Sequence, residues 1–579
     1  MKNIFIHFKK QGTIFSVIFA VSFFLVLPQI LNHSLVLGTD SLFHFNRIYD
    51  AYMQFKTGNF SYFQSNYGFQ QSGRIVNALY GPGFAYFLGG LLLAVHSWIK
   101  FQIVTSFLIF FVSGYSMYLL SREMDSTKKI SLLTAALFMG SLWITRWSTS
   151  QNFMAWGISL MPLIVLMGTK MIKNNSEGLR IIPFALVVSV LIQVHLISAL
   201  MSVGVLAIFF IVGFLKTNQK VKLLSKCFFA GLLSLVLTFN VWGALLDVFS
   251  TNKVYSPFGN LNMSAATMNL STDNATFTQI GLVMSIIFIL QIIWLFIKKD
   301  TLTLTNKVVT VLGIIFLVLS SNLLPWTSIG NSFPEIQHML QFPYRFEGFA
   351  SVLLLAGFGA TVSTLSANDF RKYFELIMTV GSVLMLVQFY LAIQFDNQLW
   401  NSEHSVISLH DTYFAKNTSN DQITNAFTGP NLDAGLLLVT KPTSDYLPNN
   451  RVLSKSPDAD YRKDMISNEK SKVTKIVDHN GDLTLSWNAK KIGDTISLPI
   501  VIYTNSSVQL NGTNLNQNKI KLSTMGKPTI NSTKNGINYL KIGYHSKIIT
   551  KSKLTIVILA WIISGLAIIV LPFTTHKKH

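Results

Sequence analysis

Long runs of apolar residues, separated by short polar segments, dominate the hydropathy pattern of the chain. Each run has about 17 to 21 residues, which matches a helix that crosses the roughly 30 Å hydrocarbon core of a bilayer. The pattern therefore predicts about 12 transmembrane helices rather than the amphipathic helices of a soluble core. The predicted spans are residues 13–31, 101–121, 129–145, 153–172, 181–197, 198–215, 227–246, 279–297, 307–324, 347–366, 375–395 and 553–573.

One further apolar run, residues 79–95, is ambiguous. Gly81, Pro82 and Gly83 open it and a Gly-Gly pair interrupts it, features that disfavour a helix exposed to lipid. If this run crossed the membrane, the Lys- and Arg-rich segments between spans would face outside, against the positive-inside rule. We therefore predict an interfacial or re-entrant helix here. Both termini are then cytoplasmic, including the basic tail 576–579.

This topology leaves large polar segments outside the cell, namely residues 32–100, 247–278, 325–346 and 396–552. The last segment is rich in Asn, Asp, Ser, Thr and Lys, and short alternating apolar stretches separated by Asn-Gly turns predict strands at 483–487, 495–503, 507–510 and 539–544. We expect a transmembrane domain over 1–395 that includes the outer loop 32–100. A β-rich, sandwich-like extracytoplasmic domain over 396–552 precedes the last span and the cytoplasmic tail at 553–579. Its first part, residues 396–470, has a less regular pattern and is expected to cross the mouth of the transmembrane domain.

Composition agrees with a membrane protein. Of 579 residues, 50% are hydrophobic and only 12% are charged, with a mean hydropathy of +0.44, which excludes a soluble enzyme, a fibrous protein and a disordered chain. The net charge of +21 comes from segments between spans, so it does not indicate nucleic-acid binding. The single cysteine, Cys227, excludes a disulfide framework and a cysteine metal site.

A first candidate site follows the first span. From Ser41 onward the pattern is helical, with Asp40 at the N-cap and His44 and Arg47 one turn apart on one face. Asp40 either caps this helix by accepting hydrogen bonds from backbone N–H groups or serves as a general base at the membrane surface. Because one carboxylate can do both, the residues leave both roles open.

A second candidate site lies before the span at 347, where Gln341, Tyr344 and Arg345 fall within five positions. They form either an aromatic belt with a snorkelling arginine or an Arg-Tyr pair that holds a phosphate in a lipid-filled cleft. His195, near the outer end of the fifth span, is either a functional ionisable group or a neutral histidine bonded to a neighbouring helix.

The segments Gly38–Arg47, Tyr80–Leu88 and Gln341–Phe346, with the His195-Leu196 pair, resemble those of bacterial GT-C membrane glycosyltransferases, nearest the YfhO-like family. Some relatives are labelled as related to 6-pyruvoyl-tetrahydropterin synthase, although nothing here indicates pterin chemistry. The resemblance implies a GT-C-like fold in the cell membrane. It also implies transfer of a sugar from a polyprenyl phosphate to an extracytoplasmic acceptor such as teichoic acid, wall polysaccharide or glycoprotein.

By this resemblance Asp40 is the catalytic base. The donor phosphate or the acceptor is bound by His44, Arg47, His195, Gln341, Tyr344 and Arg345. A synthase that loads the lipid and a flippase are further partners. Many GT-C enzymes carry a second acidic residue in the next outer loop, where this chain has Thr145–Asn152 without one. We therefore expect no obligatory metal and no other cofactor, because an arginine can stabilise a phosphate leaving group.

Two other classes of function remain as alternatives. An exporter or flippase of envelope glycans would need polar residues along a route through the spans, and most of the predicted spans have few. A surface scaffold anchored in the membrane would not need about 12 spans.

Overall fold

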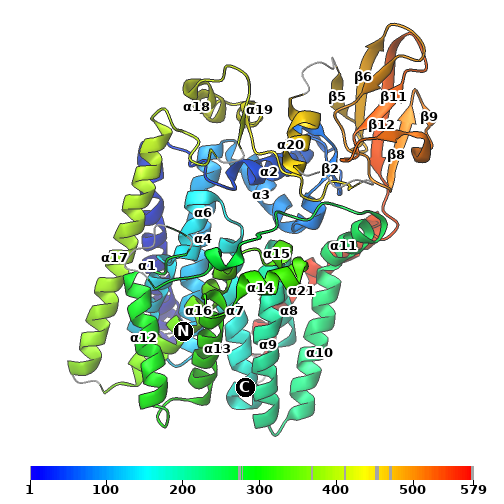
Figure 1. The fold of residues 1–579 in the computed structure, drawn as a ribbon. Coiled ribbons are helices and arrows are strands. Elements are labelled where there is room, and N and C mark those ends of the chain that lie inside the picture. Colours follow the sequence, from blue (N-terminus) through cyan, green and yellow to red (C-terminus); the bar gives the residue numbers. More distant parts are fainter. Residues whose placement is uncertain are drawn as a thin grey trace.

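The computed structural model describes residues 2–575 except 271–275, 277, 367–368, 410–411, 450–455 and 468–472. The basic tail predicted to be cytoplasmic, residues 576–579, lies outside the described residues. Most of the chain folds into a bundle of long helices with smaller helices and β-sheets gathered at one end (Figure 1).

Seven helical segments in the described part of the chain are long and apolar enough to cross a membrane, or up to nine if two bent pairs each count as one span. The predicted polytopic helical fold is therefore confirmed. The seven are α1 (Lys2–Asn32), α4 (Trp98–Glu123), α7 (Met154–Ile172), α9 (Leu196–Lys216), α16 (Glu347–Thr364) with the preceding η5 (Pro343–Phe346), α17 (Asp369–Trp400) and α21 (Lys551–Thr575). The shorter apolar helices α8 (Ile181–Val194), α12 (Leu282–Ile297) and α13 (Leu304–Ser320) lie at three further predicted spans.

The bent pairs differ from the straight spans expected from the sequence. Helices α5 (Lys128–Met139) and α6 (Leu142–Ser150) meet at 41°, at a Gly-Ser pair that interrupts the helix. Helices α10 (Lys220–Leu237) and α11 (Phe239–Thr251) meet at 63°. The Thr238 hydroxyl between them donates to the Ser234 carbonyl at 2.7 Å, a bond that bends helices.

Polar side chains inside the bundle bond to one another. Gln291 on α12 donates to the Thr310 hydroxyl on α13 at 2.7 Å, and Asn306 on α13 donates to the Thr361 hydroxyl on α16 at 2.9 Å. Such bonds hold helices together in a bilayer, where water does not satisfy polar groups. These side chains therefore have a structural role in helix packing.

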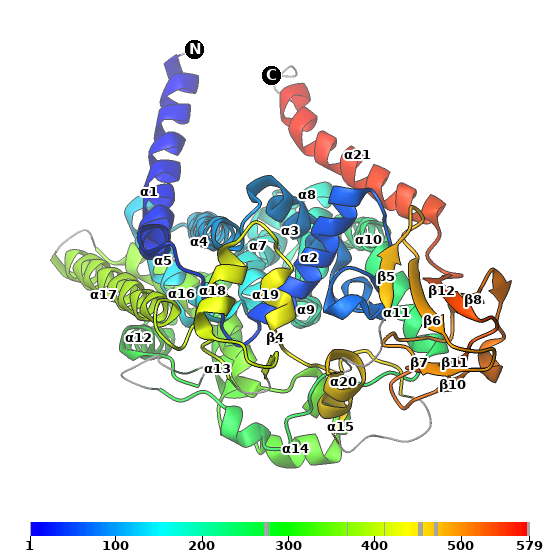
Figure 2. The same ribbon diagram turned by 90° about the horizontal axis from the view of Figure 1, so that it is seen from above.

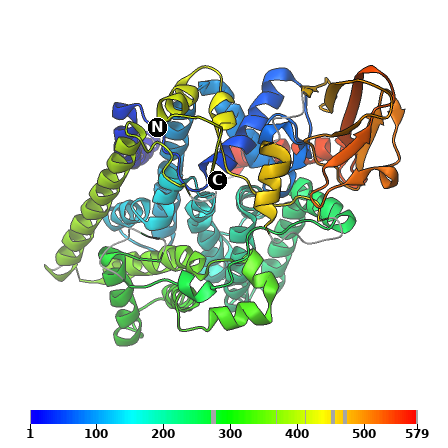
Figure 3. The ribbon, with the colours of Figure 1, turned by 45° about the horizontal axis from the view of Figure 1, so that its top comes forward.

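The two ends of the bundle differ in character. At one end, Lys129 in the first turn of α5 pairs with Glu375 of α17, and Lys173 after α7 pairs with Asp125 after α4, each at 2.7 Å. At the other end lie the remaining elements (Figures 1 and 3). They include α2 (Ser41–Thr57), β1 (Gln64–Ser65), β2 (Arg74–Ile75), α3 (Pro82–Val95), α14 (Trp326–Ser332), α15 (Pro334–Met339), α18 (Asn420–Thr428), α19 (Ala434–Leu438) and α20 (Pro457–Tyr461).

Helix α3 is the run whose position the sequence left ambiguous. It has 14 residues, fewer than the about 20 that a transmembrane helix needs. Gly81 precedes it with φ of 81°, and a Cβ there would lie 2.2 Å from the Gln193 carbonyl oxygen, so only glycine fits. This close approach ties the start of α3 to the end of α8.

Residues 474–544 form the β-rich unit, which lies beside the extramembrane helices when the molecule is viewed from above (Figure 2). A five-stranded antiparallel sheet has the order β5-β6-β12-β8-β9, and a three-stranded sheet has the order β10-β11-β7. Leu485, Trp487, Leu540, Ile500 and Ile530 belong to their common core. The strands are β5 (Thr474–Val477), β6 (Leu483–Ala489), β7 (Thr495–Ser497), β8 (Ser506–Leu510), β9 (Thr513–Asn514), β10 (Lys521–Leu522), β11 (Pro528–Asn531) and β12 (Gly536–Tyr544).

One expectation for the extramembrane segment needs correction. The strand predicted over 495–503 ends at Ser497, because Pro499 has no N–H to donate to a sheet. The described residues between 396 and 473 form no strand of these two sheets. Instead β3 (Tyr413–Phe414), β4 (Val439–Thr440), α18 and α19 cover the extramembrane end of the bundle, where Phe427 and Val439 share a core with Phe45 of α2.

Candidate functional site

The loop before α2 is fixed against the end of α6. The Asp40 N–H donates to the Ser150 carbonyl at 3.0 Å, and a Cβ on Gly38 would lie 2.2 Å from the Thr149 carbonyl oxygen. The backbones thus approach as closely as a glycine permits. Asp40 is therefore held where the first span ends and α6 ends.

The Asp40 carboxylate does not cap α2, contrary to one of the two expected roles. It makes no capping hydrogen bond. One oxygen accepts from the Asn152 amide at 3.4 Å, and the other lies 3.6 Å from the Lys441 ammonium, with 33% of the side chain exposed. The carboxylate therefore keeps lone pairs free for an incoming group.

Opposing effects act on the acidity of Asp40. Burial, the larger effect, raises the pKa of this carboxyl group, whereas the nearby Lys441 and Arg345 charges lower it. The net result is a raised pKa. A carboxylate with a raised pKa is a stronger base, and Arg345 lies close enough for its charge to act on Asp40.

Lys441 was not found from the sequence. It follows β4 and donates from Nζ to the Thr39 carbonyl at 2.7 Å, next to its contact with Asp40. Only tertiary structure brings together residues 402 positions apart along the chain. No local motif marks this lysine, which stands among other lysines of the extramembrane segment.

Arg47 lies fully buried beneath the site, with 0% exposure. Its three guanidinium nitrogens donate to Asn77 Oδ1 at 3.1 Å, to His44 Nδ1 at 3.0 Å and to the Tyr80 carbonyl at 2.6 Å. The guanidinium carbon lies 4.3 Å from the centre of the Tyr80 ring and 4.8 Å from that of Phe153. These contacts favour a positioning role for Arg47 rather than direct contact with a ligand.

His44 and His195 are both assigned as neutral donors. Arginine only donates, so His44 Nδ1 accepts from Arg47 and the proton of a neutral ring resides on Nε2. Burial, with Arg47 and Lys441 nearby, lowers the pKa of His44 well below its usual value. His195 Nδ1 accepts from the Ser198 N–H at 3.3 Å and caps α9. It thus bonds to the helix that it begins, not to a neighbouring helix.

Gln341 and Arg345 form one unit at the entry to α16. Arg345 donates to Gln341 Oε1 at 2.7 Å and to the Leu340 carbonyl at 2.9 Å. Gln341, which has φ of 60°, donates to the Phe258 carbonyl at 2.6 Å. Tyr344 stacks on Phe342 with ring centres 5.1 Å apart. Gln341 therefore orients the Arg345 guanidinium, and Tyr344 packs within the same turn.

The structure brings most of the predicted site residues into one cluster. The charge of Arg345 acts on Asp40, and the charge of Arg47 acts on both His44 and His195. The Tyr80 ring belongs to the same cluster, because its centre lies 4.3 Å from the Arg47 guanidinium carbon and 5.8 Å from the centre of the His44 ring. The cluster thus combines one carboxylate with several cations and neutral hydrogen-bond donors.

A second carboxylate, Asp445, lies near the cluster. Burial raises the pKa of Asp445 to about 6, with Arg74 and Lys441 opposing the rise and Asp40 adding to it. Arg74 donates to the Thr443 and Asp445 carbonyls at 2.7 and 2.6 Å, which fixes this loop. Within the described residues, no group of three or more His, Cys, Asp or Glu side chains is arranged to hold a metal ion.

Comparison with solved structures finds ArnT from Cupriavidus metallidurans bound to undecaprenyl phosphate. The match has 11% sequence identity and a TM-score of 0.39, and it covers 74% of this chain and 84% of that chain. A comparison with curated protein sequences finds no significant match.

The sequence also matches a family model over residues 79–395, which is more than half of the chain. That family is described as the 6-pyruvoyl-tetrahydropterin synthase related domain of membrane proteins. The match begins just before α3 and extends through most of α17, so it includes His195 and Arg345. The chain therefore belongs to the family of 6-pyruvoyl-tetrahydropterin synthase related membrane proteins.

Proposed function

We propose that this protein is an integral membrane glycosyltransferase of the GT-C type. It moves a sugar from a polyprenyl-phosphate donor to an acceptor outside the cytoplasm, such as a teichoic acid, a wall polysaccharide or a glycoprotein. The observation that carries the proposal is the Asp40 carboxylate, which is partly exposed at the extramembrane end of the bundle and lies 3.6 Å from the Lys441 ammonium, with the charge of Arg345 also acting on it.

The charges suit this reaction. Asp40 takes the proton of the acceptor hydroxyl, whose oxygen then attacks the anomeric carbon of the sugar. The bond between that carbon and the phosphate oxygen breaks, and the polyprenyl phosphate leaves with the electron pair. Lys441 and Arg345 stabilise the negative charge that develops on the phosphate. Direct attack inverts the configuration at the anomeric carbon.

The other side chains support this centre. Arg47 holds His44 and Tyr80 in place, and the neutral rings of His44 and His195 each keep one N–H for donor or acceptor oxygens. Gln341 orients Arg345, and Tyr344 packs beside it. The histidines and Arg345 are thus held by hydrogen bonds to neighbouring residues, as a preorganised site requires.

The proposed topology follows from the basic loops. Helix α17 begins at the end of the bundle opposite the sheets (Figure 1), and Glu375 in its first turns pairs with Lys129. The positive-inside rule places that end in the cytoplasm. The cluster around Asp40, the β-rich unit and the segment that covers α2 then face outside, where a flipped polyprenyl-phosphate sugar is available.

The test uses Asp40→Asn, which keeps the size of the side chain and removes the base. Transfer from a synthetic polyprenyl-phosphate sugar to envelope extract is expected to fall by a factor of about 10² or more, while the protein accumulates normally in the membrane. Asp421→Asn, at an exposed site on α18, is the matched control and should keep full activity. Unchanged transfer by Asp40→Asn would remove the proposed role of this carboxylate.

A further inference from the structure

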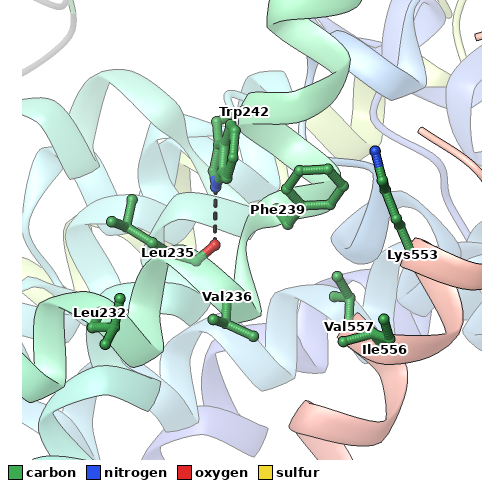
Figure 4. Close-up of a pocket in the computed structure, with 8 residues that line it drawn as sticks. All are labelled: Leu232, Leu235, Val236, Phe239, Trp242, Lys553, Ile556 and Val557. Carbon is green, nitrogen blue, oxygen red and sulfur yellow. Dashed lines mark hydrogen bonds between the residues drawn. The ribbon is translucent and has the colours of Figure 1, made fainter. Parts of the chain in front are cut away.

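A cavity of about 390 Å³ lies between the bend of α10 and α11 and the last helix α21, and none of the residues of the Asp40 cluster lines it (Figure 4). Six of its eight lining side chains are pure hydrocarbon: Leu232, Leu235, Val236, Phe239, Ile556 and Val557. Trp242 and Lys553 complete the wall. A single charged group therefore stands at an otherwise apolar cavity.

Water is a poor occupant of this cavity. A buried water needs two to four polar partners. The Trp242 indole N–H is already engaged, since it donates to the Leu235 carbonyl at 2.9 Å. Lys553 donates to the Ile548 carbonyl at 3.0 Å. An acyl chain therefore suits this apolar wall better than water does.

The bilayer around the cavity supplies acyl chains that could enter it. Helix α21 and the bent pair of α10 and α11 are candidate membrane spans. Leu235 and Ile556, which line the cavity, are 56% and 58% exposed and so face the acyl chains of the bilayer. Lys553 lies in the first turn of α21, at the polar edge of the span, where lysine side chains meet lipid head groups.

Charge selects the kind of lipid. The Lys553 ammonium lies 5.6 Å from the centre of the Phe239 ring, which holds it over the cavity. One fixed positive charge next to an acyl-sized apolar space complements the single negative charge of a phosphatidylglycerol phosphate. We propose that this cavity binds one acyl chain of an anionic glycerophospholipid, with its phosphate paired to Lys553.

This lipid would complete the packing of α21. Only 11% of the span in α21 is buried inside the protein. The Trp561 indole N–H of α21 donates a hydrogen bond to the Leu237 carbonyl at the bend, at 2.8 Å. An acyl chain between α21 and the bend adds contacts where protein atoms are few.

The experiment is native mass spectrometry of the full-length protein, released from nanodiscs that contain equal amounts of phosphatidylglycerol and phosphatidylcholine. The wild type is expected to retain phosphatidylglycerol at least fivefold over phosphatidylcholine. Lys553→Gln should lose this preference, and Lys553→Arg should keep it. Lys551→Gln is the matched control, because Lys551 lies two residues before Lys553 on α21 and does not line the cavity. This variant should resemble the wild type.

A second variant tests the cavity itself. Val236→Trp fills the apolar space, so it should reduce retention of both lipids while size-exclusion chromatography shows an unchanged folded protein. The inference is overturned if wild type and Lys553→Gln retain the two lipids alike, or if undecaprenyl phosphate added to the nanodiscs displaces the phospholipid. Because lipid retention is measured without sugar transfer, the result does not depend on the proposed enzymatic activity.

Discussion

Lys441→Gln is expected to shift the acid limb of the transferase pH profile to higher pH. Lys441 is the cation that contacts Asp40, at 3.6 Å, and its charge lowers the pKa of that carboxyl group. Without it, burial raises the Asp40 pKa further with less opposition. A general base works only when ionised, so a larger fraction of the enzyme becomes inactive as the pH falls.

The distance sets the size of the shift. At 3.6 Å, Coulomb's law gives about 1 kcal/mol in water and about 5 kcal/mol at an effective dielectric constant of about 20. The Asp40 side chain is 33% exposed and that of Lys441 is 20% exposed, so solvent screens the pair. We therefore expect an interaction of about 1 to 2 kcal/mol, which corresponds to a shift of about one pKa unit.

The assay measures kcat/KM for transfer from a synthetic polyprenyl-phosphate sugar by the purified protein in nanodiscs, because this ratio reports the pKa of the free enzyme. The acid limb of Lys441→Gln should lie about one pH unit above that of the wild type, and Lys441→Arg should restore it. Lys416→Gln removes an exposed lysine from the same extramembrane segment and should leave the profile unchanged.

The outcome separates electrostatics from binding. If Lys441 serves only to bind the donor, Lys441→Gln raises KM and leaves the acid limb in place. An acid limb that stays in place, or that moves to lower pH, would refute the reasoning that Lys441 sets the basicity of Asp40.

Three further predictions concern stability and topology. Arg47→Met leaves three buried acceptors without a donor and should lower the free energy of unfolding by about 3 kcal/mol or more, measured as a lower melting temperature in detergent; a melting temperature like that of the wild type would contradict the positioning role. Gly38→Ala places a Cβ 2.2 Å from the Thr149 carbonyl oxygen, so activity and melting temperature should both fall, whereas Gly12→Ala, which meets no atom within 4 Å, should change neither. In a cysteine-free background on whole cells, Asn518→Cys should react with an impermeant thiol reagent and Asp125→Cys should not; the reverse pattern would invert the proposed topology.

The residues of the candidate site were predicted to different degrees. Asp40 and Arg345 stand at the ends of apolar runs, where a charged side chain is conspicuous, and the structure places them within electrostatic reach. Arg47 was expected to bind the donor phosphate or the acceptor, which stays a prediction, and its three nitrogens donate to Asn77, His44 and Tyr80. Helical spacing indicated that Arg47 and His44 are neighbours, yet only tertiary packing decides that both are buried.

Helix bends and strand ends also depend on interactions that the hydropathy pattern does not show. The apolar run 227–246 predicts a span, but the bend at Thr238 depends on a hydrogen bond to Ser234 and on the packing of α11 toward the β-rich unit. The strand predicted through Tyr503 stops at Ser497, because the proline that follows removes a backbone donor. Hydropathy alone therefore does not show where a helix bends or where a strand ends.

The amino-acid sequence alone determined that the chain lies in a membrane, because apolar runs of this length satisfy their backbone hydrogen bonds only as helices in hydrocarbon. It also determined that strands lie between the last two spans, through alternating apolar residues and Asn-Gly turns. The tertiary structure alone decided that Lys441 faces Asp40, since residues 401 positions apart meet only after the extramembrane segment packs over α2. Hydropathy and turn chemistry act over short stretches of chain, whereas the charge that tunes a carboxylate depends on which distant segments pack together.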